Sequence, residues 1–265
     1  MSWSIRLETP NDYRTVEELT REAFWGFSAP TCDEHYLAHT LRLSPSFIPA
    51  LDFVALDGDR LIGNVMYSKA SVEGENGTHE VLTFGPLSVL PTYWRRGVGS
   101  ALMRHSIAEA ARLGERAIVF YGHPDYYPRF GFRRAEAFGI TAPKGHSFDA
   151  LMAMPLYGGA LDGIRGVFRE DPLFDVNAEQ TEAFNRTFPP KEPAYMPPIS
   201  LLLDALVPNE RAPFIEHNLR YLADLGRFSG REVVAWGVSA RAFDTMNEVL
   251  RTHGYVQKPN KEVCL

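Results

Sequence analysis

The stretch from residue 87 to 102 constrains the fold most, because a strand, a glycine loop and a helix follow one another there directly. The apolar run 81–90 predicts a strand that breaks at Pro91, since proline has no N–H to donate to a ladder. From residue 98 to 113 the apolar positions recur at helical spacing, and Gly114 suits a helix C-terminus. The sequence therefore predicts a helix whose N-terminus lies close to the end of a buried strand.

Two glycines, Gly97 and Gly99, lie where this loop becomes a helix. Glycine lets an anion approach the backbone, and the first turn of a helix offers N–H groups without helical partners. Arg95 and Arg96 add positive charge beside this opening. The pattern predicts a backbone cradle for a pyrophosphate. A Gly-x-Gly before a helix also fits a tight turn that binds nothing, and neither a Gly-Lys-Ser/Thr nor the third glycine of the dinucleotide fingerprint follows.

The composition indicates a folded cytoplasmic protein. The chain has 265 residues, of which 45% are hydrophobic, and a formal charge of −6 that gives no general attraction to nucleic acid. Its two cysteines, Cys32 and Cys264, form neither a metal-ligand spacing nor a disulfide framework, so we expect no metal. No apolar run approaches the roughly 18 residues that span a membrane, and the N-terminus has no signal-peptide core.

The remaining pattern alternates strands and helices. Helices are predicted over 13–24 and 35–43, strands over 3–8, 51–56, 61–69, 117–121, 137–142, 150–156 and 164–168, and a compact aromatic element over 123–132. Asp57-Gly58-Asp59 is a hairpin signal between two of the strands. Hairpins followed by a strand–helix–strand crossover indicate an α+β fold, a mixed but mostly antiparallel twisted sheet flanked by helices.

The chain is expected to divide into three parts. Residues 1–170 form the α+β domain, 171–198 form a proline-rich connector, and 199–265 form a small all-helical domain.

Two motifs carry a family resemblance. Arg-Arg-Gly-Val-Gly-Ser-Ala-Leu between strand and helix, followed by Tyr-Tyr-Pro-Arg-Phe-Gly-Phe after the next strand, resembles the GCN5-related N-acetyltransferase (GNAT) superfamily over residues 3–170. The resemblance implies the GNAT fold, acetyl-CoA as co-substrate and transfer of acetyl to an amine.

The resemblance also implies which residues hold acetyl-CoA. The family loop aligns here with residues 94–99, and Trp94 departs from the usual Gln or Arg. The backbone cradle does not depend on that side chain. The pyrophosphate would be held by the amides of Arg95, Arg96, Gly97, Val98, Gly99 and Ser100. The end of the preceding strand, Leu87, Ser88 and Val89, would pair with the pantetheine amides.

Direct attack by an amine needs an acid for the departing thiolate and an acceptor for the amine proton. The family acid, four residues before the Gly-Phe pair, corresponds to Tyr127, whose phenol ordinarily has a pKa of about 10. Tyr126 is expected to pack. The proton acceptor is left open among Glu80, His79 and His123, and the oxyanion donor is expected to be a backbone N–H near Val89.

Residues 199–265 resemble a helix-hairpin-helix module such as the C-terminal domain of the bacterial RNA polymerase alpha subunit, although Gly237-Val238-Ser239 lacks the second glycine of the hairpin. This part has eight basic and eight acidic residues, so protein binding or dimerisation is favoured over DNA binding.

Taken together, the sequence predicts an acetyl-CoA-dependent N-acetyltransferase that works by direct attack in a ternary complex. The acceptor is a small-molecule or peptide amine, and a homodimer is left open. The alternative is a non-catalytic regulator that senses acyl-CoA and uses its helical part to bind protein or DNA.

Overall fold

The computed structural model describes residues 3–25, 31–122, 124 and 126–192. Apart from residues 25–32 and Glu192, they belong to one compact unit. Its strands are β1 (Ser4–Leu7), β2 (Phe53–Asp57), β3 (Arg60–Gly74), β4 (Gly77–Val89), β5 (Ala117–Tyr121), β6 (Arg133–Arg134), β7 (Ile140–Thr141), β8 (Leu151–Pro155) and β9 (Gly166–Arg169). Its α-helices are α1 (Tyr13–Phe24), α2 (Glu34–Leu41), α3 (Val98–Arg112) and α4 (Ala178–Asn185). Short 3-10 helices, labelled η, are η1 (Pro49–Leu51), η2 (Pro91–Tyr93), η3 (Tyr127–Phe130), η4 (Ala135–Phe138), η5 (Pro143–Gly145) and η6 (Pro172–Phe174).

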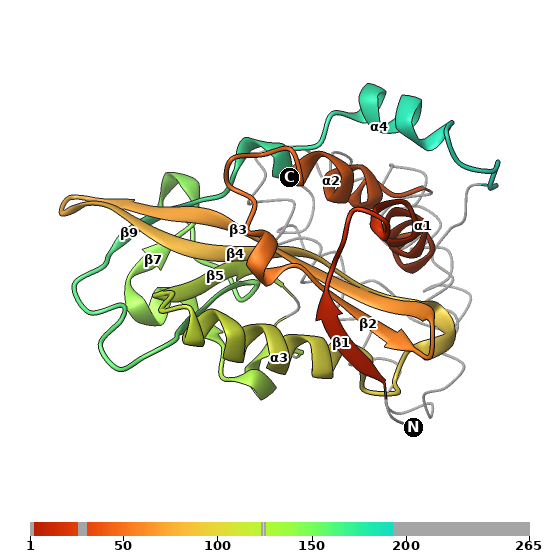
Figure 1. Ribbon diagram of the computed structural model, residues 1–265. Coiled ribbons are helices and arrows are strands. Elements are labelled where there is room, and N and C mark those ends of the chain that lie inside the picture. The colour runs from red at the N-terminus through yellow and green to blue at the C-terminus, as the bar shows by residue number, and fades with distance from the viewer. Residues whose placement is uncertain (1–2, 26–30, 123, 125, 193–265) are drawn as a thin grey trace, which may run out of the picture. The chain divides into compact units, whose positions relative to one another are not determined.

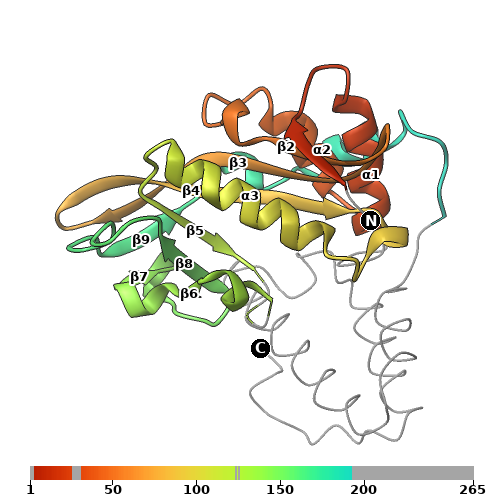
Figure 2. The ribbon, with the colours of Figure 1, turned by 60° about the horizontal axis from the view of Figure 1, so that its bottom comes forward.

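In this part of the chain, nine strands form one mixed sheet. Its main path runs β1-β2-β3-β4-β5-β8-β6, and β9 joins it through β3 and β7. All neighbours on the main path are antiparallel except β4 and β5. Helices α1 and α2 cover one face and α3 covers the other (Figure 1), and the strand order can be followed from β6 through β8, β5 and β4 in Figure 2. The α+β prediction is confirmed for this unit.

The helix predictions hold because each helix buries one regular apolar stripe. The predicted helix 13–24 is α1, and its expected inner face, which includes Val16 and Leu19, is buried. Helix α3 buries Val98, Leu102 and Met103 against the sheet, within the same cluster as phenylalanines of β4 and β5.

The hairpin of β3 and β4 is longer than the sequence indicates. The strand predicted over 61–69 continues to Gly74, and its pairing with β4 closes at Gly74 with Gly77. A third strand explains the extension, because β9 pairs with Ser71–Glu73 along the free edge of β3. Only glycine fits where β9 meets the hairpin, since a Cβ on Gly74 or Gly166 would collide with the opposing backbone carbonyl.

Two predicted segments differ in detail. The strand predicted over 137–142 begins instead as η4 and becomes the short strand β7 only after Gly139, whose φ of +76° turns the chain. The predicted connector is not plain linker over its described part, because it includes η6 and α4. The guanidinium of Arg14 in α1 donates to the carbonyl of Thr187 at 2.6 Å, and this hydrogen bond holds the end of the segment against α1.

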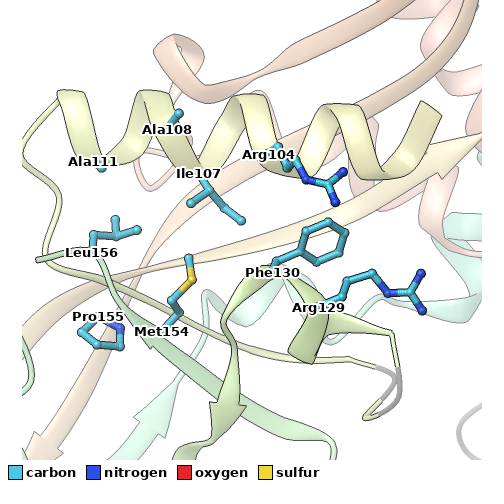
Figure 3. A pocket seen from close by; sticks show the side chains of 9 residues that line it. All are labelled: Arg104, Ile107, Ala108, Ala111, Arg129, Phe130, Met154, Pro155 and Leu156. Carbon is cyan, nitrogen blue, oxygen red and sulfur yellow. The ribbon is translucent and has the colours of Figure 1, made fainter. Parts of the chain in front are cut away.

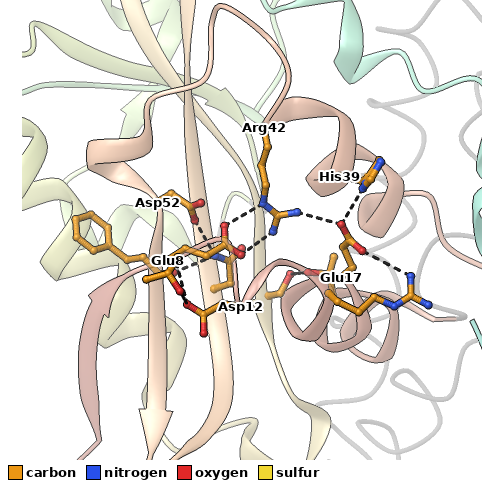
Figure 4. Close-up of polar contacts among 12 residues, drawn as sticks. Glu8, Asp12, Glu17, His39, Arg42 and Asp52 are labelled. Carbon is orange, nitrogen blue, oxygen red and sulfur yellow. Dashed lines mark hydrogen bonds and ion pairs between the residues drawn. The ribbon is translucent and has the colours of Figure 1, made fainter.

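A buried ion network joins α1, α2 and the sheet edge (Figure 4). The guanidinium of Arg42 contacts both carboxylate oxygens of Glu8, at 3.0 and 2.7 Å, and a carboxylate oxygen of Glu17 at 3.3 Å. The side chains of these three residues are 3%, 1% and 6% exposed. The backbone N–H of Glu8 donates to Asp52, and Asn64 donates to the Asp52 carboxyl at 2.9 Å.

The predictions for residues 199–265, including the helix-hairpin-helix module and its partners, lie outside the described residues.

Candidate functional site

The loop before α3 contains two residues with left-handed backbone. Arg95 has a φ of +60°, and Gly97, the N-cap of α3, has a φ of +88°. Left-handed residues among right-handed ones turn successive N–H groups to one side, and such concave nests bind anions. A left-handed arginine is also strained, and strain of this kind gathers at ligand sites. Gly97 has no side chain that could cap the first turn of α3.

The first helical hydrogen bond of α3 runs from the Ala101 N–H to the Gly97 carbonyl, at 2.9 Å. The amides of Val98, Gly99 and Ser100 precede it and therefore have no helical carbonyl to donate to. The first turn of α3 thus has the donors and the positive dipole end that the predicted cradle needs.

The arginines beside this turn are exposed to solvent, as a role in attracting an anion requires. Their directions differ. The guanidinium of Arg96 lies 5.2 Å from the ring of Tyr93 in η2, which holds it back over the preceding loop. Arg95 carries the strained backbone within the nest.

Strands β4 and β5 separate beside the cradle. Their parallel pairing is confined to Leu82 and Ile118, although β4 continues to Val89 and β5 to Tyr121. A bulge around Gly85–Pro86 shifts the register of β4 against β3, and a bulge bends the strand that carries it. The two strands therefore no longer pair beyond Leu82, and the rings of Phe84 and Phe120 pack there with their centroids 4.2 Å apart. We call this unpaired stretch the split.

The backbone at the end of β4 is directed toward this split. The N–H of Leu90 donates to the Ile62 carbonyl, so Val89, opposite Gly63, is in a non-hydrogen-bonded position toward β3. Its own N–H and C=O point away from β3, and so do those of Leu87 two residues earlier. Ser88 differs from both: its hydroxyl is buried and lies 3.0 Å from the hydroxyl of Thr20 in α1.

Trp94, which stands where the family loop usually has Gln or Arg, contacts the end of β4. Its indole Nε1 donates to the Val89 carbonyl at 2.7 Å. This hydrogen bond anchors the loop to the strand, while the Val89 N–H still points toward the split. Sequence reasoning assigned Trp94 no role, and only the fold places its ring beside Val89.

Tyr127 is half-buried in an aromatic cluster at the split. Its ring centroid lies 4.6 Å from that of Phe120 and 5.6 Å from that of Phe84, with Phe132 at 6.0 Å. Phe84 and Phe120 are each two residues beyond the last pair of β4 and β5, Leu82 with Ile118. The cluster fixes Tyr127 on the α3 side of the split.

Tyr126 does more than pack. Its hydroxyl lies 3.4 Å from the Ser100 hydroxyl, and a Cβ on Gly99 would be 3.2 Å from the same oxygen. The guanidinium of Arg129 lies 4.6 Å from the Tyr126 ring. The phenol therefore lies over the first turn of α3, a direction that a Tyr-Tyr pair in a sequence does not reveal.

A cavity of about 420 Å³ lies between α3, η3 and β8 (Figure 3). Its wall is mostly apolar, but Arg104 and Arg129 extend from α3 and η3 on either side of Phe130. Arg104 lies 5.4 Å from the Phe130 ring. Arg104 was missed at the sequence level, since it does not belong to the glycine loop.

The residues proposed from sequence as proton acceptors lie away from the split. Glu80 is 59% exposed and forms an ion pair with Lys69 at 3.0 Å, near the hairpin end of β4. His79 pairs in register with Val72, three positions before Leu82. His123 is outside the described residues. A different carboxylate, Glu170, follows β9 and reaches Thr83 of β4 at 3.4 Å.

Within the described ranges, no group of three or more His, Cys, Asp or Glu side chains could hold a metal ion. In that same part of the chain, no helix is long and apolar enough to cross a membrane.

Comparison with known proteins identifies the family. Residues 4–135 match the acetyltransferase (GNAT) domain family. The chain is 30% identical over 130 residues to the uncharacterized N-acetyltransferase YjhQ of Escherichia coli (strain K12), and the match covers 49% of this chain and 69% of that protein. It is 29% identical over 183 residues to the uncharacterized N-acetyltransferase YhbS of the same strain, with 69% and 98% covered.

A solved structure agrees with the sequence relatives. The crystal structure of YhbS from Escherichia coli in complex with CoA has a TM-score of 0.58 and 27% identity, and the match covers 65% of this chain and 92% of that one. The chain belongs to the GNAT family of acetyltransferases.

Proposed function

We propose that this protein transfers the acetyl group of acetyl-CoA to a primary amine by direct attack within a ternary complex. One observation carries the proposal: the uncapped first turn of α3 lies beside a parallel strand pair that separates after Leu82 and Ile118. Anion donors and the unpaired backbone groups at the end of β4 suit a substrate with a pyrophosphate at one end and a thioester at the other. The CoA bound by the related YhbS structure supports this choice of co-substrate.

The cradle is proposed to hold the pyrophosphate. The amides of Arg95 and of residues 97–100 donate to its oxygens, whereas the Arg96 N–H donates to the Tyr93 carbonyl at 3.3 Å. The side chains of Arg95 and Arg96 add charge. Gly99 keeps this surface open, since any side chain there would begin between the Tyr126 hydroxyl and Val89. The Tyr126 hydroxyl, near Ser100, supplies one more donor.

The pantetheine is proposed to lie along β4 in the split. Leu87 and Val89 present the backbone groups that pair with its amides, whereas Ser88 supports the strand through its contact with α1. Of the three residues predicted from sequence to contact pantetheine, Leu87 and Val89 are thus proposed to face it, and Ser88 is proposed to fix the position of the strand.

Arg104 and Arg129 are proposed to face the remaining phosphate of CoA. Arg104 is four residues beyond Ser100 on α3, which is about 6 Å along the helix axis. Guanidinium groups bind phosphate well, and those stacked on aromatic rings are oriented in advance.

In the chemical step, the amine nitrogen attacks the thioester carbonyl and a C–N bond forms. A backbone N–H of β4 near Val89 that faces the split stabilises the oxyanion, since such a donor acts where charge develops. The C–S bond then breaks, and the thiolate takes a proton from the Tyr127 phenol. A phenol held in the aromatic cluster on the α3 side is suited to this role.

Substitution of Tyr127 by Phe tests the proposal. General-acid contributions are typically about 10²–10⁴-fold, so release of CoA thiol with an amine panel should slow by at least about 100-fold. The affinity for acetyl-CoA, measured by calorimetry, should stay unchanged. Tyr126→Phe is the matched control and should weaken acetyl-CoA binding a few-fold without abolishing turnover. Unaltered turnover by Tyr127→Phe would overturn the role of acid.

A further inference from the structure

Glu170 occupies an unusual place for a carboxylate. It follows β9, and its Oε1 lies 3.4 Å from the hydroxyl of Thr83 in the middle of β4. Ser68 of β3 is directly opposite Thr83 in register, and its buried hydroxyl has no hydrogen-bond partner among the described residues. Polar groups from β3, from β4 and from the segment after β9 are thus grouped on the face of the sheet that α1 and α2 cover.

This polar group lies at the start of the split. Thr83 comes immediately after Leu82, the last residue of β4 that pairs with β5. Successive residues of a strand point to opposite faces, so Thr83 and Phe84 lie on different sides of the sheet. Phe84 packs against Tyr127 on the α3 side. Glu170 and Tyr127 therefore flank, from opposite faces, the stretch of β4 that no longer pairs with β5.

The segment after β9 crosses this face. Phe174 of η6 lies 3.3 Å from the position that a Cβ on Gly85 would take, and η6 packs onto the cluster of α2. Tyr121 of β5 lies close enough for Glu170 to raise the pKa of its phenol, beyond the increase caused by burial. Glu170 is thus bracketed by Thr83 on β4 and Tyr121 on β5, at the rim of the split.

Glu170 has no cationic partner among the described residues. Among the described residues, no lysine or arginine forms an ion pair with it. The neighbouring Arg169 donates to Glu73 at 3.1 Å, and Asp171 accepts from the hydroxyls of Ser44 and Ser46. Burial raises the pKa of Glu170 to about 8. A half-buried carboxylate of this kind gains from a cationic ligand and takes up a proton readily near neutral pH.

We infer that Glu170 accepts the proton of the acceptor's ammonium group, and that the acceptor approaches the split from the α1 and α2 face. The inference rests on the proposed acetyl transfer. It names the substrate class as cationic primary amines, because an ammonium supplies the positive charge that the described surroundings of Glu170 lack.

The proton balance is as follows. The ammonium nitrogen gives one proton to the Glu170 carboxylate, directly or through one water, and its freed electron pair forms the C–N bond. The C–S bond breaks toward sulfur, which takes the Tyr127 proton. The nitrogen releases its second proton through water to the Tyr127 phenolate, and Glu170 later releases its own to solvent. The sum is ammonium plus acetyl-CoA giving amide, CoA thiol and one proton.

The test compares full-length wild type with Glu170→Gln, which keeps the size and the contact to Thr83. The probes are spermidine and a lysine-containing peptide, which are cationic, and hydroxylamine, which is neutral at pH 7. The variant should lose at least about 100-fold in kcat/KM with the cationic amines and much less with hydroxylamine, at unchanged acetyl-CoA affinity. The wild-type rate should rise with pH until about 8, and this limb should be absent in the variant.

Glu115→Gln is the matched control, because Glu115 is also half-buried with a pKa raised by burial but precedes β5 at the end far from the split. It should behave as wild type. Equal losses for all three probes, or none, would overturn the assignment to Glu170. So would carbon-13 NMR of the side-chain carboxyls showing no group that titrates near pH 8 and vanishes in Glu170→Gln. A wild type that binds acetyl-CoA but acetylates neither cationic amine would refute the inferred acceptor class and leave co-substrate binding intact.

Discussion

Two sets of buried carboxylates in this fold differ in their partners. Glu8 and Glu17 are almost fully buried, and both contact the guanidinium of Arg42, which joins α2 to β1 and α1. Glu170 is half-buried, and among the described residues its carboxylate has one hydrogen-bond partner, the neutral hydroxyl of Thr83. Carboxylates held by arginine maintain the fold. Glu170 lies at the point where β4 and β5 stop pairing and has no cationic partner among the described residues. Such a carboxylate can bind the ammonium group of a substrate.

The largest effect is expected from removing Arg42, which tests whether the carboxylates that it contacts hold the fold together. Arg42→Ala leaves Glu8 buried without its cation, whereas Glu17 keeps its contacts with Arg14 at 3.7 Å and His39 at 2.9 Å. Breaking a buried ion pair from one side typically costs about 3–5 kcal/mol. Urea unfolding followed by circular dichroism should show this loss. The control Arg112→Ala removes an exposed pair with Glu109 and should stay within about 0.5 kcal/mol of wild type. A stable Arg42→Ala protein would mean that the network does not hold the fold.

A second test concerns Asp52, whose pKa is raised to about 9 by burial and by the neighbouring Glu8. The folded state keeps a proton there that the unfolded state releases near pH 4. The contribution to stability is therefore complete below pH 4 and is lost as the pH rises through 9. Asp52→Asn retains a donor toward Glu8 and an acceptor for Asn64 but does not titrate. It should be more stable than wild type at pH 9 by about 1–3 kcal/mol, and parallel pH profiles would contradict this account.

The smallest expected effect sharpens the contrast at Glu170. Its pKa of about 8 also exceeds the ordinary value of 4.5, so the sign is the same: stability from this group is lost as the pH rises toward 8 and beyond. Glu170→Gln should match wild type in thermal unfolding at pH 5 and exceed it by roughly 1 kcal/mol at pH 9. A variant that is destabilised at both pH values would place Glu170 with the structural carboxylates.

The sequence predicts best what is local. The loop around Gly97 and helix α3 follow from glycine positions and from apolar spacing, and both lie where they were expected. Tyr127 follows from a compact motif, although its cluster with Phe84 depends on the sheet.

The sequence does not predict contacts between distant segments. Glu170 and Thr83 are 87 positions apart, and their meeting requires β9 to pair with β3 and the chain to cross the sheet face. Nor could spacing give the direction of the Tyr126 hydroxyl, because two adjacent tyrosines leave open which one faces α3.

The central claim, that the first turn of α3 binds acetyl-CoA, is tested most directly by calorimetry with wild type, Gly99→Glu and Leu113→Glu. Gly99 is inside the helix and meets only the flexible Tyr126 hydroxyl within 3.4 Å, so the variant can fold, while its charge would repel a phosphate. Leu113→Glu adds the same charge at the far end of α3, where Leu113 is 43% exposed. We predict micromolar binding by wild type and Leu113→Glu and a loss of at least about 100-fold in Gly99→Glu. Equal binding by all three proteins, or none by folded wild type, would contradict the account.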